Sequence, residues 1–190
     1  MRTLRPSSLS RTLALATPAV SLIVQRADAA FDVFIKFDTI KGESIEKAHF
    51  EWSEAGSFSF GIESPFTIGS GGIESGRVKA APLTIRKLVD KASPQLFLRC
   101  ATGEPLPTVT LELSRISGST APVVFYKMIL SDVYVSNVHS DGVTGGDNVP
   151  TESIELNFSK ISIVYSAMDP KTGEVVAQPA VTWNFVENTK

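Results

Sequence analysis

The stretch Ile154-Glu-Leu-Asn-Phe-Ser-Lys-Ile-Ser-Ile-Val-Tyr165 decides the fold class of this 190-residue chain. Its apolar residues alternate with polar ones as far as Phe158 and then, one residue out of phase, from Ile161 onward. Alternation with a period of two is typical of a half-buried β-strand. Because a slip of one residue turns every later side chain to the other face of a sheet, we expect a bulge or bend near residues 159–160.

The same alternation recurs along the rest of the chain. It is clear in Phe31–Phe37 and in Val109–Leu113, and a second slip falls across Ser131-Asp132. Further strand-like stretches lie at about 48–60, 77–88 and 174–186. Two long strands that each bend midway favour a closed, strongly curved sheet. The sequence therefore predicts an all-β, mainly antiparallel domain in the form of a small curved β-barrel.

One short segment has helical features instead. Ser93 is a good N-cap residue, Pro94 suits the first helical position, and Gly103 ends the segment. A helix of about ten residues is marginal alone, so it should lie flanking the barrel. Cys100 is then a packing residue rather than a reactive thiol, because a nucleophilic cysteine needs an electropositive, accessible site. The apolar face expected against the barrel consists of Leu96, Phe97, Cys100 and Ala101.

A long protruding loop is expected at Gly61–Gly76, which contains five glycines and Pro65. Loops of this length are uncommon in a compact domain and are usually functional or disordered. This one also carries the apolar residues Ile62, Phe66, Ile68 and Ile73, which a merely disordered loop has little reason to expose. Two interpretations stay open: these side chains form a contact between copies of the chain, or the loop folds back and seals one mouth of the barrel.

The chain offers no pattern that points to catalysis. Its single cysteine excludes an internal disulfide and a cysteine-built zinc site, and no motif surrounds either of its two histidines. No phosphate-binding loop and no nucleophile elbow is present. A net charge of −2 without a basic stripe argues against a nucleic-acid partner. We therefore expect no catalytic residue, cofactor or metal, and we take the chain not to be an enzyme.

Residues 1–29 differ from the rest. Three early arginines precede a mostly apolar run, Leu13–Val24, and a small-x-small site follows at Ala27-Asp28-Ala29. This order is typical of a cleaved secretory signal peptide, although a mis-called leader is the alternative. The apolar run is shorter than the roughly 20 residues of a transmembrane helix, so no stable membrane insertion is expected. Residues 30–190 then form a single domain.

Several stretches together resemble the haemolysin-coregulated protein (Hcp) family, whose members form the inner tube of type VI secretion systems. The resemblance is spread over residues 31–186 and preserves the order of the segments along the chain. The segments that carry it are Phe31–Ser44 with its Lys-Gly-Glu-Ser turn, Lys87–Pro94, Cys100–Gly103, Leu130–Ser136, Pro150–Ile161 with Tyr165, and Thr182-Trp183.

The resemblance implies a curved β-barrel flanked by one helix. It also implies homohexameric rings that stack into a tube, which is secreted together with effectors and contacts sheath and spike proteins. Such a protein is cytoplasmic before the apparatus fires and extracellular afterwards, or periplasmic if residues 1–29 are a cleaved signal. The alternative function is an exported Hcp-like β-barrel binding module that works outside a type VI apparatus.

Overall fold

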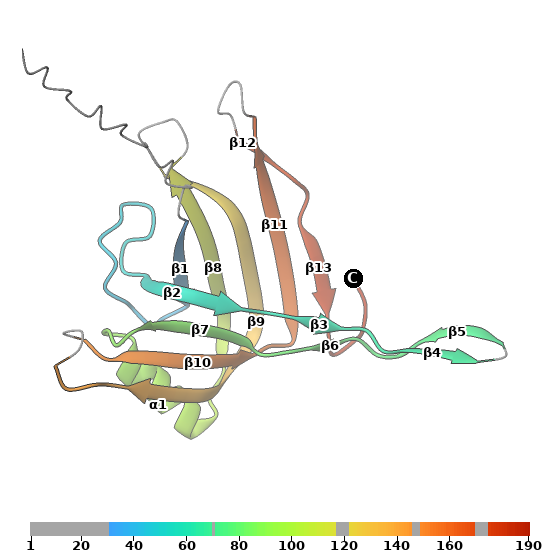
Figure 1. Cartoon of the computed structure of the whole chain (residues 1–190), viewed down its shortest axis with the longest axis horizontal. Helices are drawn as coiled ribbons and strands as arrows, with labels where there is room; N and C mark the ends of the chain where they lie inside the picture. The colour runs from blue at the N-terminus through green and yellow to red at the C-terminus, as the bar shows by residue number, and fades with distance from the viewer. Residues whose placement is uncertain (1–30, 70, 117–121, 146–148, 170–174) are drawn as a thin grey trace, which may run out of the picture.

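Antiparallel strands form most of the protein, whose computed structural model describes residues 31–69, 71–116, 122–145, 149–169 and 175–190 (Figure 1). Within these residues one helix, α1 (Ser93–Thr102), lies between β7 and β8. The strands, in chain order, are β1 (Asp32–Phe37), β2 (Ser53–Ser59), β3 (Ile62–Glu63), β4 (Phe66–Gly69), β5 (Gly72–Ser75), β6 (Lys79–Ala80), β7 (Leu83–Leu88), β8 (Leu106–Ile116), β9 (Pro122–Asp141), β10 (Thr151–Asn157), β11 (Lys160–Met168), β12 (Val175–Ala177) and β13 (Val181–Asn184).

Six of these strands close into a ring. The order of pairing is β1–β2–β7–β10–β9–β8 and back to β1, and every pair is antiparallel. The ring closes because β9, with 20 residues, is long enough to pair with β8 along one half and with β10 along the other. The prediction of a closed, curved antiparallel sheet is confirmed.

The bend in β9 lies where the sequence places its slip of phase. Asp132 has a φ of 52°, a left-handed conformation that is uncommon outside glycine but that asparagine and aspartate adopt more readily than most residues. The Ser159 hydroxyl donates to the Asp132 carboxylate over 2.6 Å and fixes this conformation. Because the strand turns here, Leu130 before the bend and Val133 after it both point into the core.

The second slip has a different outcome, and here the prediction of one long bent strand is wrong. β10 ends at Asn157 and β11 begins at Lys160, so residues 151–168 form two strands. They pair with different halves of β9: β10 with residues 134–141 and β11 with residues 126–131. The bend in β9 sends its two halves in different directions. The strand that pairs with them is therefore interrupted near Ser159, so that β10 follows one half and β11 follows the other.

Beyond the closed ring the sheet continues from β9 to β11, which pairs with β13 along one part and with β12 along another. The buried core lies inside the ring. Its fully enclosed residues include Ile35, Leu83, Ile85, Leu96, Leu111, Met128, Leu130, Ile154 and Leu156. In the 48–60 stretch only Ser53–Ser59 is a strand, because residues 41–52 form a folded loop.

α1 packs against β9, but through fewer residues than the sequence pattern predicts. The prediction of Ser93 as the N-cap residue is wrong, because α1 begins at Ser93 and its N-cap residue is Ala92. Gly103 ends the helix in a left-handed conformation with a φ of 69°. Ser93 and Leu96 are buried and Cys100 is partly buried, whereas Phe97 is 65% exposed and Ala101 is also exposed. The prediction that Phe97 and Ala101 face the barrel is wrong, because the helix turns Ser93 toward a buried charge cluster.

Candidate functional site

The predicted loop at 61–76 is part of a β-hairpin arm, residues 61–81, that projects from the ring (Figure 1). Its stem is the β3–β6 pair and its outer part is the β4–β5 pair, in which Ile68 lies opposite Ile73. The four apolar side chains singled out by the sequence are all on this arm and are all largely exposed: Ile62 65%, Phe66 64%, Ile68 83% and Ile73 72%.

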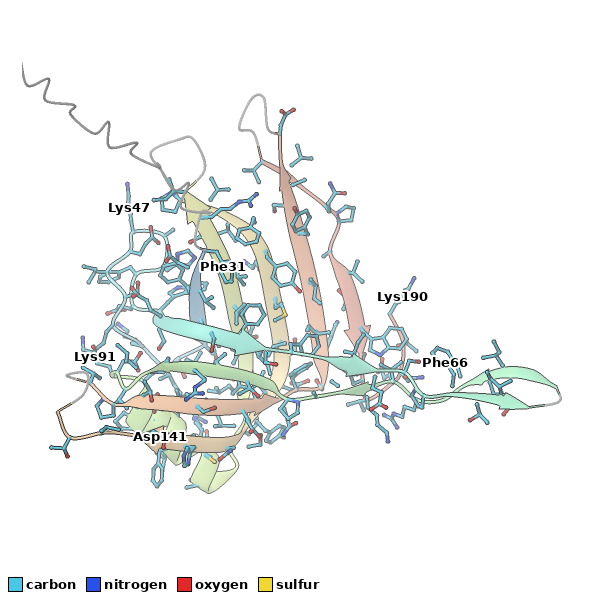
Figure 2. All side chains as sticks on the ribbon, viewed as in Figure 1. Phe31, Lys47, Phe66, Lys91, Asp141 and Lys190 are labelled. Carbon is cyan, nitrogen blue, oxygen red and sulfur yellow. The ribbon has the colours of Figure 1, made fainter. Side chains whose placement is uncertain are left out.

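Because these side chains face outward, the interpretation that residues 61–76 seal a barrel mouth is wrong. The barrel core is closed without them, and Phe66 lies on the projecting part of the arm, away from the ring (Figure 2). Monomeric proteins seldom display so many apolar side chains on one projecting element. The arm is therefore the candidate interaction site of this molecule.

The base of the arm is fixed to the C-terminal turn. The Arg77 guanidinium donates to the backbone carbonyls of Phe185 and Val186 at 2.7 Å each, and the Val78 amide donates to Asn188 Oδ1 at 3.3 Å. The arm is also closed on itself, since the Ala81 amide donates to the Gly61 carbonyl. These bonds set the direction in which the arm leaves the barrel.

An apolar groove of about 310 Å³ runs between the stem of the arm and the strands β11 and β13, which extend the sheet beyond the ring. We call it the apolar groove. Among the described residues that line it, Lys190 alone is charged. The other lining residues are Phe60 and Ile62 from the start of the arm, Val78, Ile161 and Ile163 of β11, Val181, Thr182 and Trp183 of β13, and Phe185.

Away from the arm, a buried histidine joins the loop 41–52 to the barrel. Its Nδ1 lies 2.7 Å from a Glu46 oxygen and its Nε2 lies 2.9 Å from a Glu112 oxygen, while His49 itself is 1% exposed. The His49 ring therefore bridges a carboxylate of the loop and a carboxylate of β8. The ring also stacks on Phe34 at 4.0 Å, and the Lys127 ammonium lies 2.8 Å from the other oxygen of Glu112. We call Glu46, His49, Glu112 and Lys127 the imidazole cluster.

The surroundings of Glu46 favour the ionised form of its carboxyl group. Burial by itself raises the pKa of the Glu46 carboxyl. Hydrogen bonds from the His49 ring and from the backbone amides of His49 and Ala48 outweigh burial, so the pKa lies below its ordinary value of 4.5. The ionised carboxylate therefore fastens the loop.

A second buried cluster underlies the start of α1. The Lys87 ammonium is fully buried and lies 2.6 Å from Asp90 and 2.9 Å from Glu152. The Ser93 hydroxyl donates to the same Glu152 oxygen over 2.7 Å and accepts from the Asp90 amide. We call these four residues the lysine cluster. Every partner is satisfied, so its role is to hold the helix start on the barrel.

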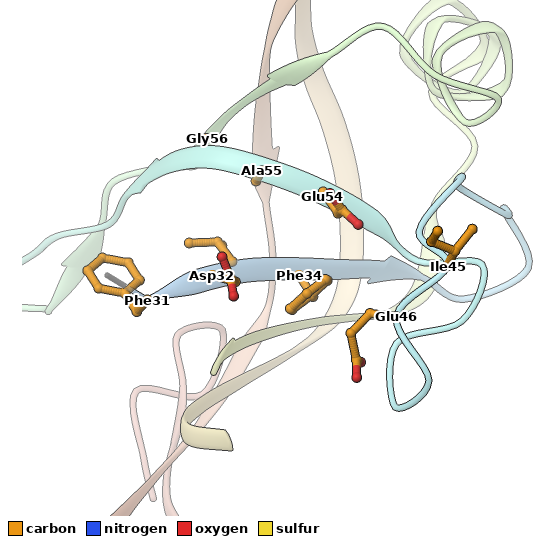
Figure 3. Close-up of a pocket in the computed structure, with 9 residues that line it drawn as sticks. Phe31, Asp32, Phe34, Ile45, Glu46, Glu54, Ala55 and Gly56 are labelled. Carbon is orange, nitrogen blue, oxygen red and sulfur yellow. The ribbon is translucent and has the colours of Figure 1, made fainter. Parts of the chain in front are cut away.

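An acidic hollow of about 520 Å³ opens beside the loop 41–52 (Figure 3). Asp32, Glu46 and Glu54 are the charged residues that line it, and Phe31, Phe34 and Ile45 supply apolar surface. The Ser44 hydroxyl donates to Glu54 over 2.8 Å. Across the described ranges, no three His, Cys, Asp or Glu side chains gather in an arrangement suited to a metal ion.

Comparison with known proteins decides the family. Residues 34–165 match the family model described as "Type VI secretion system effector, Hcp". The chain belongs to the Hcp family. It is similar to protein hcp1 of Pseudomonas aeruginosa, with 30% identity over 162 residues that cover 85% of this chain and 99% of that protein.

Solved Hcp structures share the fold. A structure described as a type six secretion system protein superimposes with a TM-score of 0.77 at 28% identity, covering 84% of this chain and 99% of the other. Hcp1 from Salmonella typhimurium superimposes with a TM-score of 0.68, also at 28% identity, covering 84% and 98%. This chain is thus a type VI secretion protein of the Hcp family.

For this Hcp chain the structure brings some predicted residues together and separates others. Ile68 and Ile73 meet across the β4–β5 hairpin. The helix residues Ser93, Pro94, Cys100 and Gly103 lie at a distance from the arm in the sequence and belong to a separate element, α1. Cys100 is partly buried and packs against the core, and its packing role stays a prediction.

Sequence reasoning missed His49 and Arg77. The partner that completes the His49 contact is 63 residues away in the chain, and Arg77 reaches across 108 residues to Phe185. No local pattern marks such long-range contacts. In the residues that the structure covers, no helix is both long and apolar enough to cross a bilayer.

Proposed function

We propose that this Hcp protein assembles into homohexameric rings that stack into the inner tube of a type VI secretion system and leave the cell with effector cargo. Family membership supports the secretion role. The projecting apolar arm supports stacking, because a ring closes by heterologous contacts within one plane and needs a separate surface to grow into a tube.

The observation that carries the proposal is the exposure of Ile62, Phe66, Ile68 and Ile73 on an element that the barrel core does not need. If these side chains were buried at a contact between rings, the contact would be stabilised by about 25 cal/mol for each Å² of apolar surface removed from water. The pairing of β4 with β5, four residues in each strand, also sets the register in which Phe66, Ile68 and Ile73 are displayed.

The experiment replaces Pro65–Ser75 with a short Gly/Ser linker. The variant should keep its melting temperature, sediment as a ring of about six subunits and form no tubes in negative-stain micrographs. The full-length chain under the same conditions is the control. Tubes of unchanged length would contradict a stacking role for the arm. A monomeric full-length chain would favour the exported binding module instead.

A further inference from the structure

Two further surfaces lie on opposite sides of the molecule. The loop 41–52, which carries Lys47, lies on one side, and the apolar groove beside Lys190 lies on the other (Figure 2). A cyclic ring requires each subunit to present two different faces to its neighbours. The chemistry of these two surfaces is complementary.

The first surface is centred on Ile45, which is 88% exposed at the rim of the acidic hollow. Ile45 also lines a second hollow of about 310 Å³ on its other side, together with Leu88 and Val149. Across the two hollows every charged lining residue is an acid: Asp32, Glu43, Glu46, Glu54 and Asp90. Ile45 is thus an apolar knob between two hollows that are lined by acidic residues.

This knob is displayed on a rigid support. The amides of Gly42 and Ser44 donate to the backbone carbonyls of Glu51 and Trp52, and the Glu51 amide donates back to Ser44. The imidazole cluster fastens the same loop to β8. A loop held by a buried charge network and yet exposing Ile45 is pre-organised for a contact, which lowers the entropic cost of binding.

The second surface has the opposite charge. Lys190 is the charged residue that lines the apolar groove, and Arg77 and Lys79 flank Val78 in its wall and are exposed. Val181 on β13 is 68% exposed at the groove. The groove therefore offers apolar surface for the knob and cations for the acids around it.

We infer that the Ile45 knob of one copy of this chain seats in the apolar groove of the next copy, head to tail. The inference rests on the proposed ring and names the two faces that close it. In a two-fold contact the Ile45 surfaces of two copies would face each other, and their acidic residues would repel. Charge therefore favours the head-to-tail contact over the two-fold contact. The outer part of the arm, the β4–β5 pair, stays free for contacts between rings.

The first test uses Ile45→Asp and Val181→Asp, two exposed positions, measured by sedimentation and thermal melting. Each variant should raise the concentration at which rings dissociate by roughly tenfold or more, equivalent to about 1.4 kcal/mol, with little change in melting temperature. Phe97→Asp on the exposed face of α1 is the matched control and should leave the rings intact. Rings of unchanged stability in both variants would overturn the inference while leaving the proposed tube standing.

The second test reads the orientation of the contact. Ile45→Cys and Val181→Cys are combined in a Cys100→Ser chain and treated with a short thiol-reactive cross-linker. The double variant should give a ladder up to about six subunits, and each single variant should give none. Cross-linking within Ile45→Cys alone would show a two-fold contact and overturn the inference. A wild-type chain without rings would instead refute the proposed function itself.

Discussion

Lys87 illustrates how a single residue controls the stability of the barrel. Its ammonium is completely buried and is neutralised by Asp90 and Glu152. Removing one member of such a cluster leaves carboxylates without a counter-charge in the protein interior, where charges are poorly solvated. The stability of the protein therefore depends on all members of the cluster being present, more than on the attraction within any one ion pair.

We predict that Lys87→Met lowers the free energy of unfolding by about 3–5 kcal/mol. The double variant Lys87→Met with Glu152→Leu should recover part of this loss, because it leaves one carboxylate fewer without a partner. Urea denaturation followed by circular dichroism measures both. Equal stability of the single variant and the wild type would show that the buried charge is not needed.

Glu46 gives a prediction for pH. A carboxyl whose pKa is lowered on folding stabilises the fold above its unfolded pKa, and this stabilisation is lost as the pH falls through the folded value. The melting temperature of Glu46→Gln should therefore lie below that of the wild type at neutral pH. The difference should shrink between roughly pH 5 and pH 3. Glu43→Gln, at an exposed position of the same loop, should show no such convergence.

At the scale of elements, the loop 41–52 depends on one close approach of the backbone. A Cβ atom on Gly42 would collide with the Trp52 carbonyl oxygen, so the loop has to move to accept any side chain. We predict that Gly42→Ala destabilises the protein by about 1–3 kcal/mol. Gly61→Ala is the control, because nothing lies within 4 Å of its added Cβ. A harmless Gly42→Ala would mean that the loop is adaptable.

The strands show what a pattern of alternation can and cannot predict. The slip at Ser131-Asp132 and the slip near Ser159 look alike in the sequence, yet the first is a bend within β9 and the second ends one strand and starts another. Both slips reorient side chains, which is a local property. Whether the strand continues depends on which partner lies alongside, and that is a tertiary property.

For the whole molecule, residues 1–29 lie outside the described residues and their processing stays a prediction. The early arginines, the apolar run and the site at Ala27-Asp28-Ala29 predict that the mature chain begins at Ala30. Mass spectrometry of the protein purified from its native host measures this directly. A chain that begins at Met1 would contradict a cleaved signal, and one that begins near Val24 would indicate a mis-called start.

The sequence by itself determined the fold class, because alternation along β1, β8 and β10 follows directly from burying one face of a strand. It also determined the apolar character of the arm and, through its resemblance, the family. Only the tertiary structure decided that the arm is a hairpin held by Arg77, that Phe97 faces outward, and that His49 and Lys87 are buried among carboxylates. These features arise from contacts between residues far apart in the chain, and no local spacing encodes them.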